Sequence, residues 1–285
     1  MVGPTGSRFA RPLRVLRVRD GQVATARDHL VVEEPLELRV AGRTVGVTMR
    51  TPGHDTELAI GFCLTEGLVP GPEAVQTVRA CAATGTEGEY NTLQVDLRPG
   101  VPPPDPSLER LQVTSSSCGV CGRASIDAVR VRCQPLTDDR TTVSAATLSA
   151  LPDRVRAAQR LFELTGGLHA AGLADADGTL LCVREDVGRH NAVDKVIGWA
   201  ATQGRLPLRG HVLLVSGRCS FELAQKAAVA GIPIVAAVSA PSSLAVTLGQ
   251  ELGLTIVGFL RGSGMNVYTG ADRVRLGQAA AVAGT

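Results

Sequence analysis

Alternating hydrophobic and polar positions in the first hundred residues predict several strands and one helix. Val31 to Val40 and Thr44 to Arg50 alternate on either side of the turn Ala41-Gly42-Arg43, which is the pattern of a β-hairpin. A run of apolar residues with helical spacing follows, between Asp55 and Gly67. Two more strands are expected after it, at Val75 to Ala82 and at Tyr90 to Leu97.

Strand and helix patterns alternate more regularly in the second half of the chain. A helix capped by Ser149 is expected to end at Gly166-Gly167, and the turn Asp177-Gly178 predicts a hairpin between His169 to Ala174 and Thr179 to Val187. The elements expected after it are the helices Asn191 to Ala201, Phe221 to Ala230 and Ser243 to Leu252, and the strands His211 to Val215, Ile232 to Val238 and Leu254 to Leu260. Because nearly all strand residues are apolar, we predict a parallel sheet with helices on both faces.

These patterns predict an α/β protein, with an α+β N-terminal domain and a three-layer α/β/α C-terminal domain. The expected parts are an N-terminal extension (1–30), the α+β domain (31–110), a CxxC loop and connection (111–145), the α/β/α domain (146–270) and a C-terminal tail (271–285).

Composition narrows the class of protein. The chain is 44% hydrophobic and 20% charged, as in ordinary globular proteins. Its formal net charge of +2 does not indicate a nucleic-acid-binding surface. The N-terminus has no apolar stretch typical of a secretory signal. The longest apolar stretch, Ala227 to Ala240, is interrupted by glycine and proline and is too short to cross a membrane. We therefore expect a cytoplasmic protein with reduced thiols.

The most reactive feature of the chain is a pair of cysteines, Cys118 and Cys121, in the run Ser115-Ser116-Ser117-Cys118-Gly119-Val120-Cys121-Gly122-Arg123. Each cysteine precedes a glycine, and a segment with five prolines, Arg98 to Pro106, lies upstream and predicts a linker. This setting favours an exposed loop over a core. Two thiols at this spacing can share a metal, form a disulfide or pass a sulfur atom from one to the other.

Two of these chemistries lack the residues that usually accompany them. A structural zinc site needs about four ligands, and the sequence contains neither a second CxxC nor a pair of histidines at ligand spacing. We therefore predict no structural metal. A thioredoxin-like pair would begin a helix after a strand, whereas here a linker precedes the cysteines. Thiol–disulfide exchange remains an alternative, although the sequence around the cysteines lacks the strand-to-helix context of a thioredoxin-like pair.

Sulfur carriage fits the cysteine pair best. A thiolate can attack a persulfide and become a persulfide itself, by the same exchange chemistry that operates at disulfides. The glycine-flanked amides and Arg123 would lower the pKa of the thiol and stabilise its anion. Two inert cysteines in a surface loop are the alternative.

A second candidate site lies where the predicted parallel strands end. The strand ends carry Ser216-Gly217-Arg218, Ser239 to Ser243, and Arg261-Gly262-Ser263-Gly264. Ligands of open α/β sheets bind beyond the carboxyl ends of the strands, and helix N-termini favour anions. A phosphate-bearing ligand is therefore expected, although serine and glycine at such turns can also be simple helix caps. The chain has no Walker or G-x-G-x-x-G sequence for ordinary ATP or NAD.

Charged residues are concentrated in one further segment, Arg184 to Lys195, at a predicted strand-to-helix junction. His190 within it could act as an acid–base group or a hydrogen-bond donor. The chain uses arginine almost throughout and has only two lysines, Lys195 and Lys226. Either an ammonium is needed at these positions, or two lysines remain there by chance.

Several of these segments together resemble one protein family. Ser117 to Gly122, Glu185 to Lys195, Ser216 to Leu223, and Gly258 to Arg261 with Asn266 to Tyr268 are similar, in this order, to the formate dehydrogenase accessory sulfurtransferase family FdhD. The resemblance extends from about Pro35 to Tyr268 and omits only the first thirty and last fifteen residues.

The resemblance implies a cytoplasmic homodimer that takes persulfide sulfur from a cysteine desulfurase. The sulfur would pass to the molybdenum (or tungsten) bis-guanine-dinucleotide cofactor of the formate dehydrogenase catalytic subunit. Cys118 matches the persulfide-bearing cysteine and Cys121 its companion. The family's cofactor-binding segment corresponds to Phe259, Leu260, Arg261, Gly262, Ser263 and Gly264. The C-terminal domain would be related in fold to cytidine deaminases without their zinc.

The two pyrophosphates of this cofactor suit the arginine-bearing strand ends. We expect Arg218 and Arg261 to contact phosphate or guanine, and His190 and Lys195 to lie nearer the metal. The other functions to be tested are a chaperone that binds and delivers the cofactor without transferring sulfur, and a thiol–disulfide oxidoreductase.

Overall fold

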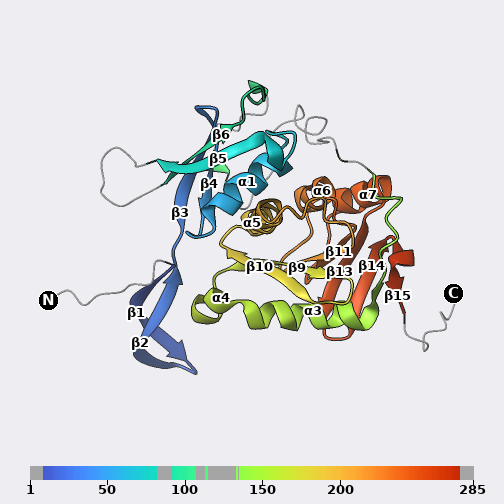
Figure 1. The fold of residues 1–285 in the computed structure, drawn as a ribbon. Helices are drawn as coiled ribbons and strands as arrows, with labels where there is room; N and C mark the ends of the chain where they lie inside the picture. The colour runs from blue at the N-terminus through green and yellow to red at the C-terminus, as the bar shows by residue number, and fades with distance from the viewer. Residues whose placement is uncertain (1–8, 82–90, 107–112, 115–132, 134, 277–285) are drawn as a thin grey trace.

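The computed structural model describes residues 9–81, 91–106, 113–114, 133 and 135–276. Cys118 and Cys121 lie outside these residues. Within the described part, two sheets with their helices form two domains, and a separate hairpin lies beside them (Figure 1).

The N-terminal domain is a five-stranded sheet with a buried helix. Its elements are β3 (Glu34–Val40), β4 (Arg43–Arg50), α1 (Asp55–Thr65), the 3-10 helix η1 (Pro72–Ala74), β5 (Val75–Cys81), β6 (Thr92–Leu97) and β7 (Val113–Thr114). The strand order is β5-β6-β3-β4-β7. Leu36, Leu38 and Val40 point from β3 into the core that α1 covers. The predicted hairpin, helix and two further strands of this domain are confirmed.

The C-terminal domain contains a six-stranded sheet in the order β10-β9-β11-β12-β13-β14. Its strands are β9 (His169–Asp175), β10 (Leu180–Asp186), β11 (His211–Val215), β12 (Ile234–Ala237), β13 (Thr255–Arg261) and β14 (Gly264–Thr269). Its helices are α3 (Ala145–Ala158), α4 (Arg160–Thr165), α5 (Arg189–Thr202), α6 (Phe221–Val229) and α7 (Ser243–Leu252). Strand β15 (Val274–Arg275) follows the 3-10 helix η3 (Ala271–Arg273) and pairs with β8 (Val143–Ser144), which precedes α3.

The predicted three layers are present. Residues of β11 alternate between two cores: Leu213 and Val215 join the residues of α5, α6 and α7, while Val212 and Leu214 join those of α3. Figure 1 shows α3 on one side of the sheet and α5, α6 and α7 on the other. The central strands β11 and β12 are therefore buried on both faces, which explains their nearly unbroken apolar sequence.

The prediction of a parallel sheet was only partly correct. Strands β11, β12 and β13 run parallel, but β9 is antiparallel to both of its neighbours and β14 is antiparallel to β13. The turn at Asp177-Gly178 joins β9 to β10 as the predicted hairpin, and the turn at Gly262-Ser263 joins β13 to β14, because a short turn can join only antiparallel strands. An apolar strand sequence indicates that both faces of the strand are buried. It does not indicate whether the strand runs parallel or antiparallel to its neighbours.

The helix predicted after Ser149 begins earlier. Ser144 is its cap: the Ser144 hydroxyl accepts a hydrogen bond from the Thr147 amide at 2.9 Å, and α3 runs on through Pro152. The predicted helix is also two helices, because the chain breaks at Gln159 before α4.

The predicted N-terminal extension contains an antiparallel hairpin of β1 (Ala10–Arg19) and β2 (Gln22–Val31). The turn Asp20-Gly21 joins the strands, and both of its residues have positive φ. An Asp-Gly turn is a hairpin signal, so this element could have been recognised from the sequence.

Helices α1 and α5 hold the two domains together. A Cβ atom on Gly61 of α1 would overlap the Asp194 carbonyl of α5, and one on Gly198 of α5 would overlap the Glu57 carbonyl of α1. The two glycines are therefore required for the backbones to approach this closely. This contact fixes the N-terminal sheet beside the start of α5, where the candidate site lies.

Candidate functional site

The three predicted strand ends converge at one edge of the sheet. The Cys219 amide donates to the Ala240 carbonyl at 3.2 Å, and the Ser242 amide donates back to the Cys219 carbonyl at 2.9 Å. The Phe259 amide donates to the Ser239 carbonyl at 3.1 Å. The loops after β11 and β12 and the end of β13 therefore form one continuous surface, as the sequence predicted.

Basic side chains gather at this edge from the antiparallel strands as well. Gly217 lies between the His169 ring of β9 and the Arg189 side chain of α5, which would be 3.4 and 3.8 Å from a Cβ at that position. Burial lowers the pKa of Arg189, and the charge of Arg218 lowers it further. Burial and the charge of Arg189 likewise lower the pKa of His169. Mutual repulsion of this kind is relieved by an anion.

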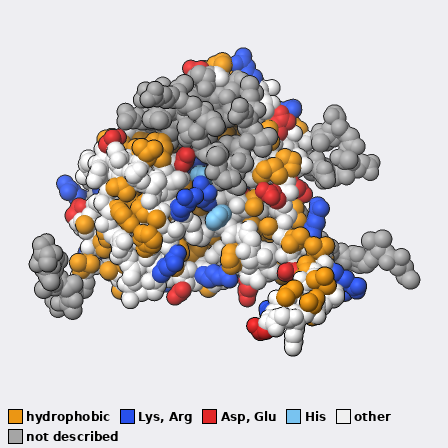
Figure 2. Space-filling model, turned by 180° about the vertical axis from the view of Figure 1, so that it is seen from behind, with side chains coloured by type: hydrophobic (Ala, Val, Ile, Leu, Met, Phe, Trp, Pro, Cys, Tyr) orange, Lys and Arg blue, Asp and Glu red, His pale blue; other side chains and the backbone are white. Residues whose placement is uncertain are grey.

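Beside this edge lies a cavity of about 610 Å³, within the usual range for small-molecule sites. Residues of α3, of α4 and of the strand ends line it, among them Arg156, Phe162, Gly167, His169 and Ser216. The Arg156 guanidinium stacks on the Phe162 ring, 3.9 Å from its centroid. Figure 2 shows basic side chains gathered around a histidine on one face of the molecule. This combination of cavity and cations suits an anionic ligand with a flat ring.

The predicted cofactor-binding segment forms the end of β13 and its turn. Phe259 has a left-handed φ of 52°, and 44% of its surface is exposed. Such a backbone costs of order 1–3 kcal/mol and is typical of functional sites. The Arg261 Nε donates to the Val238 carbonyl at 3.1 Å, which holds this exposed side chain over the end of β12. Leu260 is fully buried in the core that faces α3.

Gly262, Ser263 and Gly264 complete the β13–β14 turn. Gly262 has a φ of 53°, and Gly264 begins β14 opposite Arg261. These residues are exposed and lie beside Arg261, so the structure brings them to the same edge as the other predicted residues.

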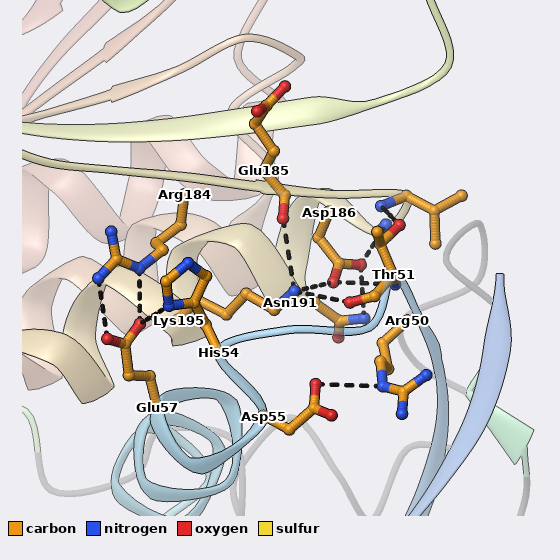
Figure 3. Close-up of polar contacts among 12 residues, drawn as sticks. Arg50, Thr51, His54, Asp55, Glu57, Arg184, Glu185, Asp186, Asn191 and Lys195 are labelled. Carbon is orange, nitrogen blue, oxygen red and sulfur yellow. Dashed lines mark hydrogen bonds and ion pairs between the residues drawn. The ribbon is translucent and has the colours of Figure 1, made fainter. Parts of the chain in front are cut away.

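Lys195 is not at the surface of the site. Only 1% of its surface is exposed, and its ammonium lies 2.7 Å from the buried Asp186 carboxylate and donates to the Thr51 carbonyl at 2.9 Å. Asp186 also accepts from the Gly188 amide and the Asn191 side chain (Figure 3). The expected contact of Lys195 with a ligand does not fit this burial. Lys195 instead stabilises the junction between β10 and α5, which places the start of α5 beside the strand ends.

Other charged side chains of the segment Arg184–Lys195 also form hydrogen bonds or ion pairs within the protein. Arg184 forms a double hydrogen bond with Glu57 of α1 across the domain boundary (Figure 3). Burial alone would raise the pKa of Glu57, but Arg184 and His54 together lower it to about 2. The Glu185 carboxylate accepts the first amides of α4, those of Leu161 and Phe162. Arg189 and His190 are the members of this segment that lie beside the strand ends.

The second lysine, Lys226, is buried as well. Its ammonium donates to Asp194 at 2.9 Å, to Thr65 at 2.8 Å and to Glu66 at 2.9 Å, and so ties α6 to α5 and to the end of α1. Both lysines of the chain therefore occupy buried ion pairs, which supports the interpretation that an ammonium is needed at each position.

His190 is held neutral beside this network. Burial lowers its pKa to about 4, and the charges of Lys226 and Arg189 act in the same direction. Its Nε2 lies 3.4 Å from the Ser220 hydroxyl and 3.9 Å from the Glu222 carboxylate. At neutral pH the ring can accept or donate one hydrogen bond at the strand-end surface.

The depressed pKa of His190 predicts a pH dependence of stability. Because the folded state binds this proton less tightly than the unfolded chain, the stability is full above about pH 6.5 and is lost as the pH falls towards about 4. Replacing His190 by asparagine should therefore flatten the fall of the urea midpoint over this range. If the wild-type and variant midpoints fell in parallel, the assignment would be contradicted.

The described cysteines are poor candidates for sulfur chemistry. Five of the seven are described and all five are free thiols. Burial raises the pKa of Cys63, Cys182 and Cys219 to about 12 and that of Cys133 to about 11. Among the described residues, moreover, no group of three metal-ligating side chains is found, and no helix could span a membrane.

The chain flanking the two remaining cysteines is placed near the site. Thr114, the last described residue before them, pairs with Thr48 of β4. The Thr48 hydroxyl lies 3.2 Å from the Asn191 side-chain oxygen at the start of α5. On the far side, the Cys133 sulfur lies 4.0 Å from the Gln225 carbonyl of α6.

Comparison with known proteins places the chain in a defined group. The model of the FdhD/NarQ family matches residues 31–275. A sulfur carrier protein FdhD from Mycolicibacterium paratuberculosis is 59% identical over 92% of this chain and 97% of the relative. One from Streptomyces coelicolor is 57% identical over 92% of this chain and 95% of the relative. A crystal structure described as a formate dehydrogenase accessory protein from Desulfotalea psychrophila matches with a TM-score of 0.76 at 24% identity, over 94% of this chain and 100% of that one, and shows the same fold.

Proposed function

The chain belongs to the FdhD/NarQ family, and we propose that, like the relatives named sulfur carrier proteins, it carries sulfur for a formate dehydrogenase, as a persulfide on Cys118 or Cys121. The donor is a cysteine desulfurase, and the acceptor is the molybdenum (or tungsten) bis-guanine-dinucleotide cofactor of that enzyme's catalytic subunit. The cofactor is a bound substrate here. We also propose the cytoplasm as the place of action and a homodimer as the assembly.

One observation carries this proposal: the chain enters the CxxC segment beside the strand-end site. Four residues lead from Thr114 to Cys118, a length that spans at most about 14 Å. Through Thr48 and Asn191, Thr114 is linked to the start of α5, next to Arg189 and His190. The described chain therefore enters the CxxC segment on the side where α5 begins, which supports sulfur transfer to a ligand held at the strand ends.

Sulfur loading needs no oxidant. The Cys118 thiolate attacks the outer sulfur of the donor's persulfide, the new S–S bond forms on Cys118, and the donor's cysteine leaves as a thiolate. Delivery as sulfide requires two electrons. The Cys121 thiolate can supply them by forming a disulfide with Cys118 while hydrosulfide leaves, and a cellular dithiol then reduces the disulfide.

The residues at the sheet edge fit the charged part of the proposed substrate. A pyrophosphate requires cationic donors, and Arg189, Arg218 and Arg261 lie at this edge. The exposed ring of Phe259 offers a surface for a guanine to stack on. His190 is neutral and can donate to an oxygen or a sulfur without adding charge. The proposed kinship with cytidine deaminases is compatible with these three layers.

The nucleotide part of the proposal can be tested with GDP. Replacing Arg218 or Arg261 by alanine removes a charge-assisted hydrogen bond worth about 1.5–3 kcal/mol, so GDP affinity should fall at least tenfold in isothermal titration. Arg98, exposed on the N-terminal domain, is the matched control, and its alanine variant should bind as the wild type does. Unchanged affinity of the Arg218 and Arg261 variants would refute their placement at the ligand.

A further inference from the structure

The β1–β2 hairpin has the most exposed apolar surface of the described chain. Ten large hydrophobic side chains are exposed in the described residues, and five of them belong to this hairpin: Leu13, Leu16, Val18, Val23 and Leu30. Exposure reaches 73% at Leu16, near the tip. An isolated two-stranded hairpin is marginally stable in water, so these side chains require a covering surface.

Only the base of the hairpin is anchored. Ala10 is buried, and the Val32 amide donates to the Phe9 carbonyl at 2.9 Å. From there the two strands extend away from both domains (Figure 1). The backbone edges of both strands are open towards the tip, which is the arrangement that accepts an added strand from another protein.

The charge of the hairpin indicates what kind of surface covers it. Residues 10–31 contain five arginines and two aspartates, whereas the formal net charge of the whole chain is +2. Arg14 lies directly opposite Arg27, and the next pairs on the same face are Leu16 with Thr25 and Val18 with Val23. Like charges directly opposite each other destabilise a strand pair. A carboxylate from a partner between the two arginines would remove this repulsion, and the same repulsion disfavours pairing with the hairpin of a second copy.

The position of the hairpin indicates which partner docks there. A Cβ on Gly167 would lie 3.3 Å from the Val31 side chain at the end of β2, and Gly167 lines the 610 Å³ cavity. The hairpin therefore begins at the rim of the cavity that lies beside the strand ends. The match to the family model begins at residue 31, the last residue of β2.

We propose that the β1–β2 hairpin is the docking arm for the acceptor enzyme: an acidic strand edge of the apo formate dehydrogenase subunit covers Leu16, Val18 and Val23 and places carboxylates between Arg14 and Arg27. This inference rests on the proposed function, because it assumes that the acceptor is such an enzyme. Docking there would bring the empty cofactor site of the acceptor to the rim of the cavity.

Charge reversal tests the docking arm. The apo catalytic subunit of formate dehydrogenase from the same organism is titrated against the wild-type protein and against an Arg14→Glu/Arg27→Glu variant, with binding followed by biolayer interferometry. We expect the variant to bind at least tenfold more weakly. An Arg98→Glu/Arg140→Glu variant, with two other exposed arginines reversed, should bind as the wild type does. A Leu16→Ser/Val23→Ser variant should also lose affinity.

Persulfide loading by a cysteine desulfurase separates this inference from the proposed function. Loading should be unaffected in the hairpin variants, which also shows that they are folded. No binding of the apo subunit to wild type, or equal binding by both charge-reversal variants, would overturn the docking arm while leaving sulfur carriage intact. It would equally be overturned if the hairpin variant changed only the dimer equilibrium in sedimentation, or only binding to single-stranded RNA.

Discussion

Replacing Cys118 by alanine is expected to reduce formate dehydrogenase activation to the level seen without the protein. In the proposed order of transfer the Cys118 thiolate accepts the sulfur atom and Cys121 only releases it, so the variant lacks the accepting group. Four of the five described cysteines offer no substitute, because burial raises their pKa to about 11 or 12. The measurement is formate dehydrogenase activity in cells that lack the native gene and express the variant.

The matched control is Cys81→Ala, at a partly exposed cysteine at the end of β5, which should activate as the wild type does. Full activation by Cys118→Ala would instead favour the chaperone that binds the cofactor without transferring sulfur. Reduction of a model disulfide by the unmodified protein, without activation, would favour the oxidoreductase.

Replacing Lys195 by methionine is expected to destabilise the protein by about 3–5 kcal/mol, because the Asp186 carboxylate would stay buried without its cation. The pair joins α5 to the end of β10, and Lys195 also donates to the Thr51 carbonyl of the N-terminal domain. Urea unfolding at neutral pH measures the loss. The change is volume-conserving, so the missing charge and not a cavity should dominate.

A conservative control separates a buried structural role from ligand contact. Arg98→Met, at an exposed arginine, should change stability by less than about 0.5 kcal/mol. Under conditions in which the Lys195→Met variant remains folded, its GDP affinity should be close to that of the wild type. Normal stability together with lost GDP affinity would contradict the buried role and restore Lys195 to the ligand.

Local patterns predicted most elements of the fold because buried positions require apolar residues, and their spacing shows in the sequence. Strands β11 and β12 are almost entirely apolar because helices cover both of their faces. Strand direction is not visible in such apolar runs: the hairpin of β9 and β10 was predicted from its turn, but the antiparallel pairing of β9 with β11 was not, and no strand was predicted at β14. The hairpin β1–β2 was missed because its apolar residues are exposed and do not report a core.

Site residues could be predicted where strand order alone places them at the sheet edge. They could not be predicted where their position depends on packing between distant segments. Loops after parallel strands must meet at one edge, so Arg218 and Arg261 were placed correctly at the sheet edge. Lys195 could not be placed, because its partner Asp186 and the carbonyl of Thr51 come together only after α1 has packed on α5. Arg189 lay within the charged segment Arg184 to Lys195 that the sequence singled out, but His169 was missed, because antiparallel pairing of β9 with β11 brings the start of that strand to the same edge.

Mass spectrometry of the loaded protein tests the central claim most directly. The full chain is incubated with a cysteine desulfurase and cysteine, then alkylated, digested and mapped. We predict the mass of one additional sulfur atom on the peptide that contains Cys118 and Cys121, and none on peptides with Cys63, Cys182 or Cys219. An unmodified CxxC peptide under conditions in which the desulfurase itself carries a persulfide would contradict sulfur carriage by this protein.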